Sequence, residues 1–295
     1  MFADPRAPEP AMLPLPSVIA AGRTDRGHVR ARNEDAFAVD AAVGIGIVAD
    51  GMGGHPGGDV ASRIAVRAAA DALRALLPPV VGAGARDAAD PGARPDARPA
   101  AGFDPHDTEP GWEDAMRESV LRAHQAIRAR GREEPALDGM GTTTTMLALD
   151  PAQRRFTLAN VGDSRVYLHR DGRLEQLTRD DTWVQERVEA GRLSAAEAVG
   201  HPMGHLLTQC LGLEPEPRPR TMTGSFREGD AFLLCSDGLV ACLTPDEIAQ
   251  VLDATLDGTA EGAERTLAKL VDAANAVGGF DNITVVLMAA APNGR

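Results

Sequence analysis

Short apolar or β-branched runs alternate with longer amphipathic segments along most of this chain. Runs of the first kind have the length and composition of β-strands. They span residues 44–49, 142–149, 156–161, 166–169, 231–235 and 283–288. Arg170-Asp171-Gly172 is a hairpin turn signal, and it predicts that the strand at 166–169 pairs with a further strand over residues 173–177.

The amphipathic segments predict four helices. Residues 61–77 are rich in Ala, Leu and Arg, and residues 112–130 place four apolar residues on one helical face. Thr244-Pro245-Asp246-Glu247 is a capping box that opens a helix through about residue 252. Residues 259–276 form a further amphipathic segment that ends at Gly278-Gly279.

The order of these elements favours an α+β fold. Two long helices separate the first strands from a central block in which strand follows strand, which indicates antiparallel pairing rather than regular βαβ alternation. Two stacked antiparallel β-sheets flanked by helices, a four-layer α-β-β-α sandwich, account for this order.

Two stretches lack periodicity. Residues 1–16 are rich in Pro and Ala and predict a flexible N-terminal tail. Residues 78–111 are too long for an ordinary connection and predict a disordered insertion in a surface loop. We assign residues 17–295 to a single domain that contains this insertion.

The composition of the chain argues against some classes of binding partner. The chain has 295 residues and a net charge of −13, which argues against general binding to nucleic acid or to a membrane surface. No apolar run has the ~18 residues of a membrane helix, and no signal peptide is visible at the N-terminus. Three cysteines at no metal-ligand spacing indicate reduced thiols. We therefore expect a cytoplasmic protein, and we expect it to be a monomer.

Four aspartates lie at the ends of predicted strands or in the tight turns beside them. They are Asp50, Asp163, Asp237 and Asp281. A carboxylate at a strand end points out of the sheet while its backbone stays rigid. If several converge, they form a hard, oxygen-rich pocket that suits Mg²⁺ or Mn²⁺ better than Zn²⁺. With an arginine nearby, such a pocket suits phosphoryl chemistry.

Two further segments are candidates for the same site, although each has an ordinary interpretation when taken alone. Arg30 precedes the adjacent carboxylates Glu34 and Asp35, of which one could face a pocket while the other braces it; an exposed charged strand is the alternative. The glycine-rich loop after Asp50 allows the Gly51 carbonyl to approach a metal, and a plain turn is the alternative.

Taken together and in order, these motifs resemble the metal-dependent serine/threonine protein phosphatases of type 2C, with the bacterial branch most similar. The resemblance runs from about residue 18 to residue 290, outside the 78–111 insertion. The motifs are Arg30-x3-Glu34-Asp35, Asp50-Gly51-Met52-Gly53-Gly54, Gly139-Met140-Gly141-Thr142-Thr143, Gly162-Asp163-Ser164-Arg165, Cys235-Ser236-Asp237-Gly238-Leu239 and Asp281-Asn282-Ile283-Thr284.

The resemblance implies a role for each candidate residue. Asp50 would bridge two Mn²⁺ or Mg²⁺ ions, with the Gly51 carbonyl as a ligand of one ion and Asp237 and Asp281 as ligands of the other. Glu34 and Asp35 would bind or orient metal-bound water, Arg30 would hold the substrate phosphate, and Asp163 would help to bind a third, weaker ion. A hydroxide between the two ions would then attack phosphoserine or phosphothreonine directly.

One position departs from the family pattern. Many eukaryotic members have a histidine two residues after the bridging aspartate, where this chain has Met52. We therefore expect metal-bound water to protonate the leaving oxygen, and we interpret His55 as a loop-structuring residue. His201 and His205 have i, i+4 spacing, but Pro202 disfavours a regular helix there, so we assign them no metal.

The resemblance also implies a flap and a class of partner. Residues 181–212 would form a mobile flap beside the site, for which an ordinary helical excursion is the alternative. Phosphorylated proteins, including a serine/threonine kinase or its substrates, would be the partners. Two other functions remain open: a phosphatase-like regulator that binds phosphoproteins with little turnover, and a metal-dependent phosphodiesterase. The first is disfavoured by the complete acidic set and the second by the charge of −13.

Overall fold

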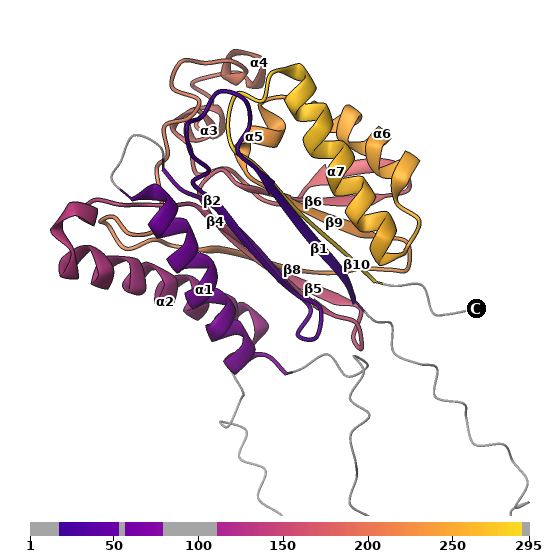
Figure 1. Cartoon of the computed structure of the whole chain (residues 1–295), viewed down its shortest axis with the longest axis horizontal. Coiled ribbons are helices and arrows are strands. Elements are labelled where there is room, and N and C mark those ends of the chain that lie inside the picture. The colour runs from indigo at the N-terminus through magenta and orange to yellow at the C-terminus, as the bar shows by residue number, and fades with distance from the viewer. Residues whose placement is uncertain (1–17, 53–56, 79–110, 291–295) are drawn as a thin grey trace, which may run out of the picture.

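A computed structural model describes residues 18–52, 57–78 and 111–290. Two five-stranded antiparallel sheets form its centre (Figure 1). The first sheet has the order β1-β10-β9-β6-β7. Its strands are β1 (Val18–Asp25), β10 (Ile283–Ala290), β9 (Ala231–Cys235), β6 (Arg165–Arg170) and β7 (Arg173–Gln176).

The second sheet has the order β2-β3-β4-β5-β8. Its strands are β2 (Asp35–Asp40), β3 (Ile45–Asp50), β4 (Thr144–Asp150), β5 (Arg155–Val161) and β8 (Arg220–Ser225). The long helices α1 (Gly58–Leu76) and α2 (Trp112–Glu133) cover this sheet, while α6 (Pro245–Thr255) and α7 (Ala260–Val277) cover the first (Figure 1). The short helices are η1 (Pro135–Leu137), α3 (Trp183–Glu189), α4 (Ala195–Ala198) and α5 (Asp237–Val240).

Three hydrophobic clusters hold the layers together. One lies between the second sheet and α1 and α2, one between the two sheets, and one between the first sheet and α6 and α7. Side chains alternate between the two faces of a strand, so one strand can contribute to two clusters. In β10, Val285 and Leu287 face the helices, while Val286 and Met288 face the other sheet. The predicted α+β four-layer sandwich is confirmed.

The strongest sequence signals correspond to the observed elements. Asp171 and Gly172 both have positive φ angles, 52° and 71°, as the hairpin between β6 and β7 requires. The capping box of α6 is formed, and Gly278 ends α7. Three strands were missed, namely β1, β2 and β8. Strand β8 lies at a sheet edge with mostly exposed residues, so it carries little apolar pattern.

Some predictions fall on residues that the structure does not describe. The tail over residues 1–16, residues 79–110 of the proposed insertion, and His55 all lie outside the described ranges. Within those ranges, no helix combines the length and the apolar character needed to cross a membrane.

Candidate metal and phosphate site

A pocket of about 440 Å³ opens where strand ends of the two sheets meet. Its charged side chains come from segments far apart in the sequence. The second sheet supplies Asp50 at the end of β3, and the first sheet supplies Asp237 directly after β9. Seven of the predicted site residues line this pocket: Arg30, Glu34, Asp50, Gly51, Asp163, Asp237 and Asp281.

Asp35 is the one predicted site residue that does not line the pocket. It pairs with Asp50 across strands β2 and β3, and its side chain is buried behind the pocket. The Ser236 hydroxyl donates a hydrogen bond of 2.8 Å to Asp35 Oδ2. Glu34 therefore faces the pocket, while Asp35 braces its floor and adds a buried carboxylate to it.

The electrostatics of the pocket are dominated by carboxylates that repel one another. Burial and the charge of Asp35 raise the pKa of Asp50 well above its usual value, with further contributions from Asp237 and Asp163. Burial raises the pKa of Asp163 to about 8 and that of Asp35 to about 7. The pKa of Asp237 is also raised, by burial and by Asp281. Several negative charges thus share a site that lacks sufficient counter-charge.

The donor set fits divalent cations. Asp35 Oδ1 and Asp237 Oδ1 are both buried without a hydrogen-bond partner, which is costly unless a cation or water satisfies them. Carboxylate and carbonyl oxygens are the ligands that Mg²⁺ and Mn²⁺ prefer. Within residues 18–52, 57–78 and 111–290, however, no three His, Cys, Asp or Glu side chains are already arranged to hold an ion. The carboxylates are gathered in one pocket without forming a finished coordination shell.

One carboxylate of the pocket, that of Asp281, is bound by Arg30, which is part of the reason that the coordination shell is incomplete. Arg30 Nη2 donates a hydrogen bond of 2.6 Å to Asp281 Oδ2, and the two groups form an ion pair at the pocket rim. Asp281 is therefore held by the arginine that sequence reasoning assigned to the substrate phosphate. The pair fixes the guanidinium at the pocket. There, phosphate oxygens would compete with Asp281 for the guanidinium, and a cation would compete with the guanidinium for Asp281.

Close backbone packing sets the position of two ligand candidates. The Gly51 N–H donates to the Glu34 carbonyl at 3.1 Å, and a Cβ atom at Gly51 would lie only 2.3 Å from the Gly58 carbonyl oxygen. At Gly238, a Cβ atom would lie 2.0 Å from the carbonyl oxygen of Asn282. Only glycine fits at either place, which explains the glycine that follows both Asp50 and Asp237.

Residues 205–210, which belong to the segment predicted to form a flap, also line the pocket. The mobility of that segment stays a prediction. Cys210 is one of these lining residues, but burial raises the pKa of its thiol to about 11, so it is protonated near neutral pH and a poor nucleophile. His205 also lines the pocket, on a turn rather than on a helix.

A family model described as protein phosphatase 2C matches residues 24–273 of the chain. The chain belongs to the protein phosphatase 2C family. The matched range contains every motif described above except Asp281 and its neighbours, which follow it. The resemblance inferred from the motifs is therefore confirmed.

Curated relatives in this family come from several bacteria. The serine/threonine protein phosphatase PstP of Mycobacterium tuberculosis is 39% identical over 271 residues, covering 90% of this chain and 44% of the relative. This chain therefore spans less than half of that relative. The serine/threonine phosphatase stp of Listeria monocytogenes is 36% identical over 276 residues, covering 90% of this chain and 93% of the relative.

Solved structures share the fold. The serine/threonine phosphatase PstP/Ppp of Mycobacterium tuberculosis superimposes with a TM-score of 0.72 at 35% identity, covering 94% of this chain and all of that one. The catalytic domain of PstP in complex with two manganese ions gives a TM-score of 0.69 at 34% identity, covering 94% and 99% of the two chains.

Asn282 belongs to one of the family motifs, and its role becomes visible only in the structure. Its Nδ2 donates hydrogen bonds of 2.9 Å to the carbonyls of both Arg26 and Arg32, and its Oδ1 accepts one of 2.8 Å from Glu34 N–H. Asn282 thus holds both ends of the loop that carries Arg30. The signal was its place beside Asp281, but its partners lie about 250 residues away in the sequence.

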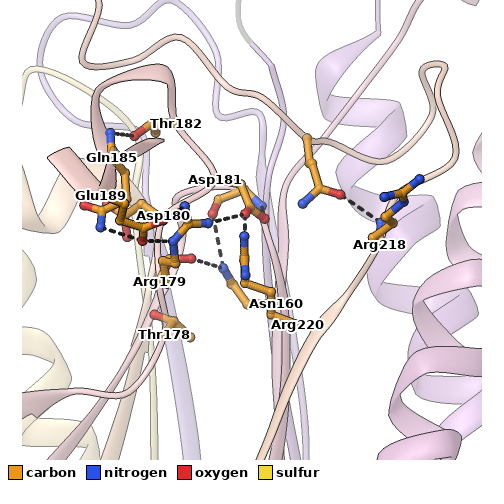
Figure 2. A network of polar contacts seen from close by, with 12 residues as sticks. Asn160, Thr178, Arg179, Asp180, Asp181, Thr182, Gln185, Glu189, Arg218 and Arg220 are labelled. Carbon is orange, nitrogen blue, oxygen red and sulfur yellow. Dashed lines mark hydrogen bonds and ion pairs between the residues drawn. The ribbon is translucent and has the colours of Figure 1, made fainter. Parts of the chain in front are cut away.

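Asp181 is a second residue that sequence reasoning left without a role. Its side chain is 1% exposed and forms ion pairs with Arg179 and Arg220 (Figure 2). It also accepts a hydrogen bond from the Gly162 N–H. Arg220 Nε donates to Oδ1 at 3.1 Å, and Gly162 N–H donates to Oδ2 at 3.2 Å. Gly162 and Asp163 form the turn after β5 that contributes Asp163 to the pocket. The hydrogen bond from Gly162 to Asp181 therefore connects this turn to the start of the predicted flap.

We expect Asp181→Asn to lower the free energy of unfolding by about 2 kcal/mol. The change removes the charge that two arginines share, but both arginines retain access to water, so the loss stays below that of a fully buried pair. Urea denaturation measures it. The matched control is Asp71→Asn, which breaks an exposed Asp–Arg pair with Arg74 and should change stability by less than about 0.5 kcal/mol. Equal losses in the two variants would contradict the structural role of Asp181.

Proposed function

We propose that this chain is a metal-dependent protein serine/threonine phosphatase that hydrolyses phosphoserine and phosphothreonine monoesters. The observation that carries the proposal is the pocket in which Asp50, Asp163, Asp237 and Asp281 meet beside one arginine. Membership in the protein phosphatase 2C family and the names of the relatives support the same reaction.

Each residue receives a role by its place in the pocket. Asp50, the Gly51 carbonyl, Asp237 and Asp281 would hold two divalent ions, and Glu34 would orient water around them. Asp35 would support this arrangement from behind, as a buried carboxylate next to Asp50. Asp163, whose turn is fixed by Asp181, would contribute to a third, weaker ion. The manganese complex of PstP supports two ions in a related protein, and we propose Mn²⁺ or Mg²⁺ here.

When bound, the ions act as Lewis acids that lower the pKa of water and offset the charge on the phosphate. Arg30 presents its guanidinium at the pocket rim, where it can hold two phosphate oxygens in a fork and orient the phosphorus for in-line attack. Met52 lines the pocket but has no proton to donate, so the leaving oxygen takes its proton from solvent in the pocket. The protonated Cys210 offers no route through a cysteinyl phosphate.

Metal removal tests the proposal. We expect release of phosphate from a phosphothreonine peptide in the presence of Mn²⁺, and loss of at least about 99% of the rate when EDTA is added, since the carboxylate pocket has little other positive charge. Malachite green measures the phosphate, and readdition of Mn²⁺ should restore the rate. Equal rates with and without chelator would refute metal dependence.

The same assay separates the competing functions. A bis(p-nitrophenyl) phosphodiester should be cleaved far more slowly than p-nitrophenyl phosphate if the protein is a phosphomonoesterase. Preferential cleavage of the diester would indicate a phosphodiesterase. Binding of a phosphopeptide without turnover would indicate the regulatory function instead.

The biological setting follows as part of the proposal. Phosphorylated proteins are the substrates, in keeping with the relatives' names. We propose a serine/threonine kinase or its targets as the partners. We further propose that the protein acts in the cytoplasm as a monomer, that residues 17–295 form one catalytic domain, and that residues 181–212 move as a flap.

A further inference from the structure

The lining of the catalytic pocket is of two chemical kinds. Arg30 and the carboxylates carry its charge, whereas residues 205–215 contribute apolar side chains among the polar His205, Thr208, Gln209 and Glu214. We call the apolar part of the lining the apolar wall. It consists of Leu206, Leu207, Leu213 and Pro215 together with Met52, which follows Gly51. A phosphate needs only the charged part of the lining, so the apolar wall is available to another part of a substrate.

Five of the seven exposed large apolar side chains among the described residues belong to, or adjoin in sequence, segments that contribute to this pocket. Leu206, on the apolar wall, is 42% exposed. Two of the other exposed large side chains, Val199 and Met203, lie in the same segment, and Val29 and Phe280 directly adjoin Arg30 and Asp281 in sequence. The remaining two are Met222 and Val277. Single exposed apolar residues are normal on a surface, but a group of them at a cleft indicates an interaction site.

The backbone fixes the apolar wall in place. Trp183 N–H donates to the Leu206 carbonyl at 2.8 Å, and Thr182 and Leu207 form a β-bridge, so the two ends of the flap are paired at their base. Leu211 and Thr142 exchange two backbone hydrogen bonds of 2.8 and 3.2 Å, which anchor the chain just before Leu213. The two ends of the flap are therefore anchored beside the phosphate site. Leu206, Leu207 and Leu213 keep their places there even if the middle of the flap moves, so this part of the wall needs little ordering to bind a partner.

We propose that the apolar wall binds an apolar side chain next to the phosphorylated serine or threonine of a substrate protein. This inference rests on the proposed phosphatase function and assigns it a substrate preference. An acidic neighbour would be a poor alternative, because Arg30 is the only arginine or lysine among the described residues that line the pocket, and the phosphate occupies it. Burying apolar surface on the wall favours a neighbour such as leucine.

Three phosphothreonine peptides test the preference. They differ only in the two residues that flank phosphothreonine, which are leucine, serine or glutamate. We expect kcat/KM in saturating Mn²⁺ to be at least about fivefold higher for the leucine peptide than for the serine peptide, with the glutamate peptide lowest. In Leu206→Ser, the ratio between the leucine and serine peptides should fall to about 1. Turnover of p-nitrophenyl phosphate by the same variant reports separately on the catalytic centre.

Met222→Ser is the matched control. Met222 on β8 is 43% exposed, nearly the same as Leu206, but it does not line the pocket. This variant should keep the preference of the unchanged protein. Equal rates on the leucine and serine peptides, a preference for glutamate, or a preference that survives Leu206→Ser would each overturn the inference. Failure to hydrolyse any peptide or p-nitrophenyl phosphate would instead refute the phosphatase function.

Discussion

Asp237→Asn should make the protein more stable than the unchanged protein in the absence of metal, and less stable than it in the presence of Mn²⁺. Without metal, Asp237 is a half-buried charge beside other carboxylates, and both burial and Asp281 raise its pKa. Replacing the carboxylate with a neutral amide removes that repulsion. In EDTA we therefore expect the variant to unfold at a higher temperature than the unchanged protein, by about 2–4 °C.

With Mn²⁺ the order should invert. Ions that bind only the folded state stabilise it by an amount that grows with ligand concentration and affinity, and the variant has lost a charged ligand. We expect the Mn²⁺ affinity of the variant to fall by more than about 100-fold. Changing a residue that only supports a metal ligand lowers affinity by up to about 100-fold, and loss of a ligand itself should cost more. At limiting Mn²⁺, phosphopeptide turnover should fall by a similar factor.

Differential scanning fluorimetry in EDTA and in a Mn²⁺ titration measures the inversion, and calorimetric titration measures the affinity. Asp114→Asn is a suitable control, because Asp114 is an exposed aspartate on α2 that pairs with Arg117 on the same helix. It should leave both midpoints unchanged. If Asp237→Asn kept the full stabilisation by Mn²⁺, Asp237 would not be a metal ligand.

The fold could be predicted because its main elements carry strong local signals. Strand β9 lies in the interior of its sheet and is a continuous apolar run, so its bounds were predicted correctly at both ends. Strand β1 was missed because its apolar residues form only a short run at its start and are followed by the polar stretch Arg23–Asp25. Strand β8 was missed because it is an edge strand that pairs with β5 and has mostly exposed residues, so its sequence carries little apolar pattern.

The charged residues of the site could be predicted for a related reason. A carboxylate at the end of a buried strand is visible in the sequence. Three aspartates end or follow such strands and Asp281 precedes one, which together suggest a common pocket. The supporting contacts could not be predicted in this way. The Asp35–Ser236 hydrogen bond joins residues about 200 positions apart, and the ion pair of Arg30 with Asp281 spans about 250. Such pairs depend on how the two sheets meet, which no local pattern encodes.

Arg30→Ala should reduce kcat/KM for a phosphothreonine peptide by about 10² to 10³ at saturating Mn²⁺. Such a loss is typical when one preorganised donor to a developing anion is removed. The variant also frees Asp281 from its ion pair, so the Mn²⁺ concentration needed for half-maximal rate should not rise. This behaviour separates a role in phosphate binding from the role of Asp237, whose loss should raise that concentration strongly.

Two further variants make the result specific. Arg30→Lys keeps the charge but loses the planar fork, so it should recover only part of the rate. Arg32→Ala removes an exposed arginine from the same loop while keeping the Arg32 carbonyl that binds Asn282, and it should retain nearly full activity. Phosphate release over a matrix of peptide and Mn²⁺ concentrations measures all three. If excess Mn²⁺ restored the rate of Arg30→Ala, the arginine would act on the metal site rather than on the phosphate.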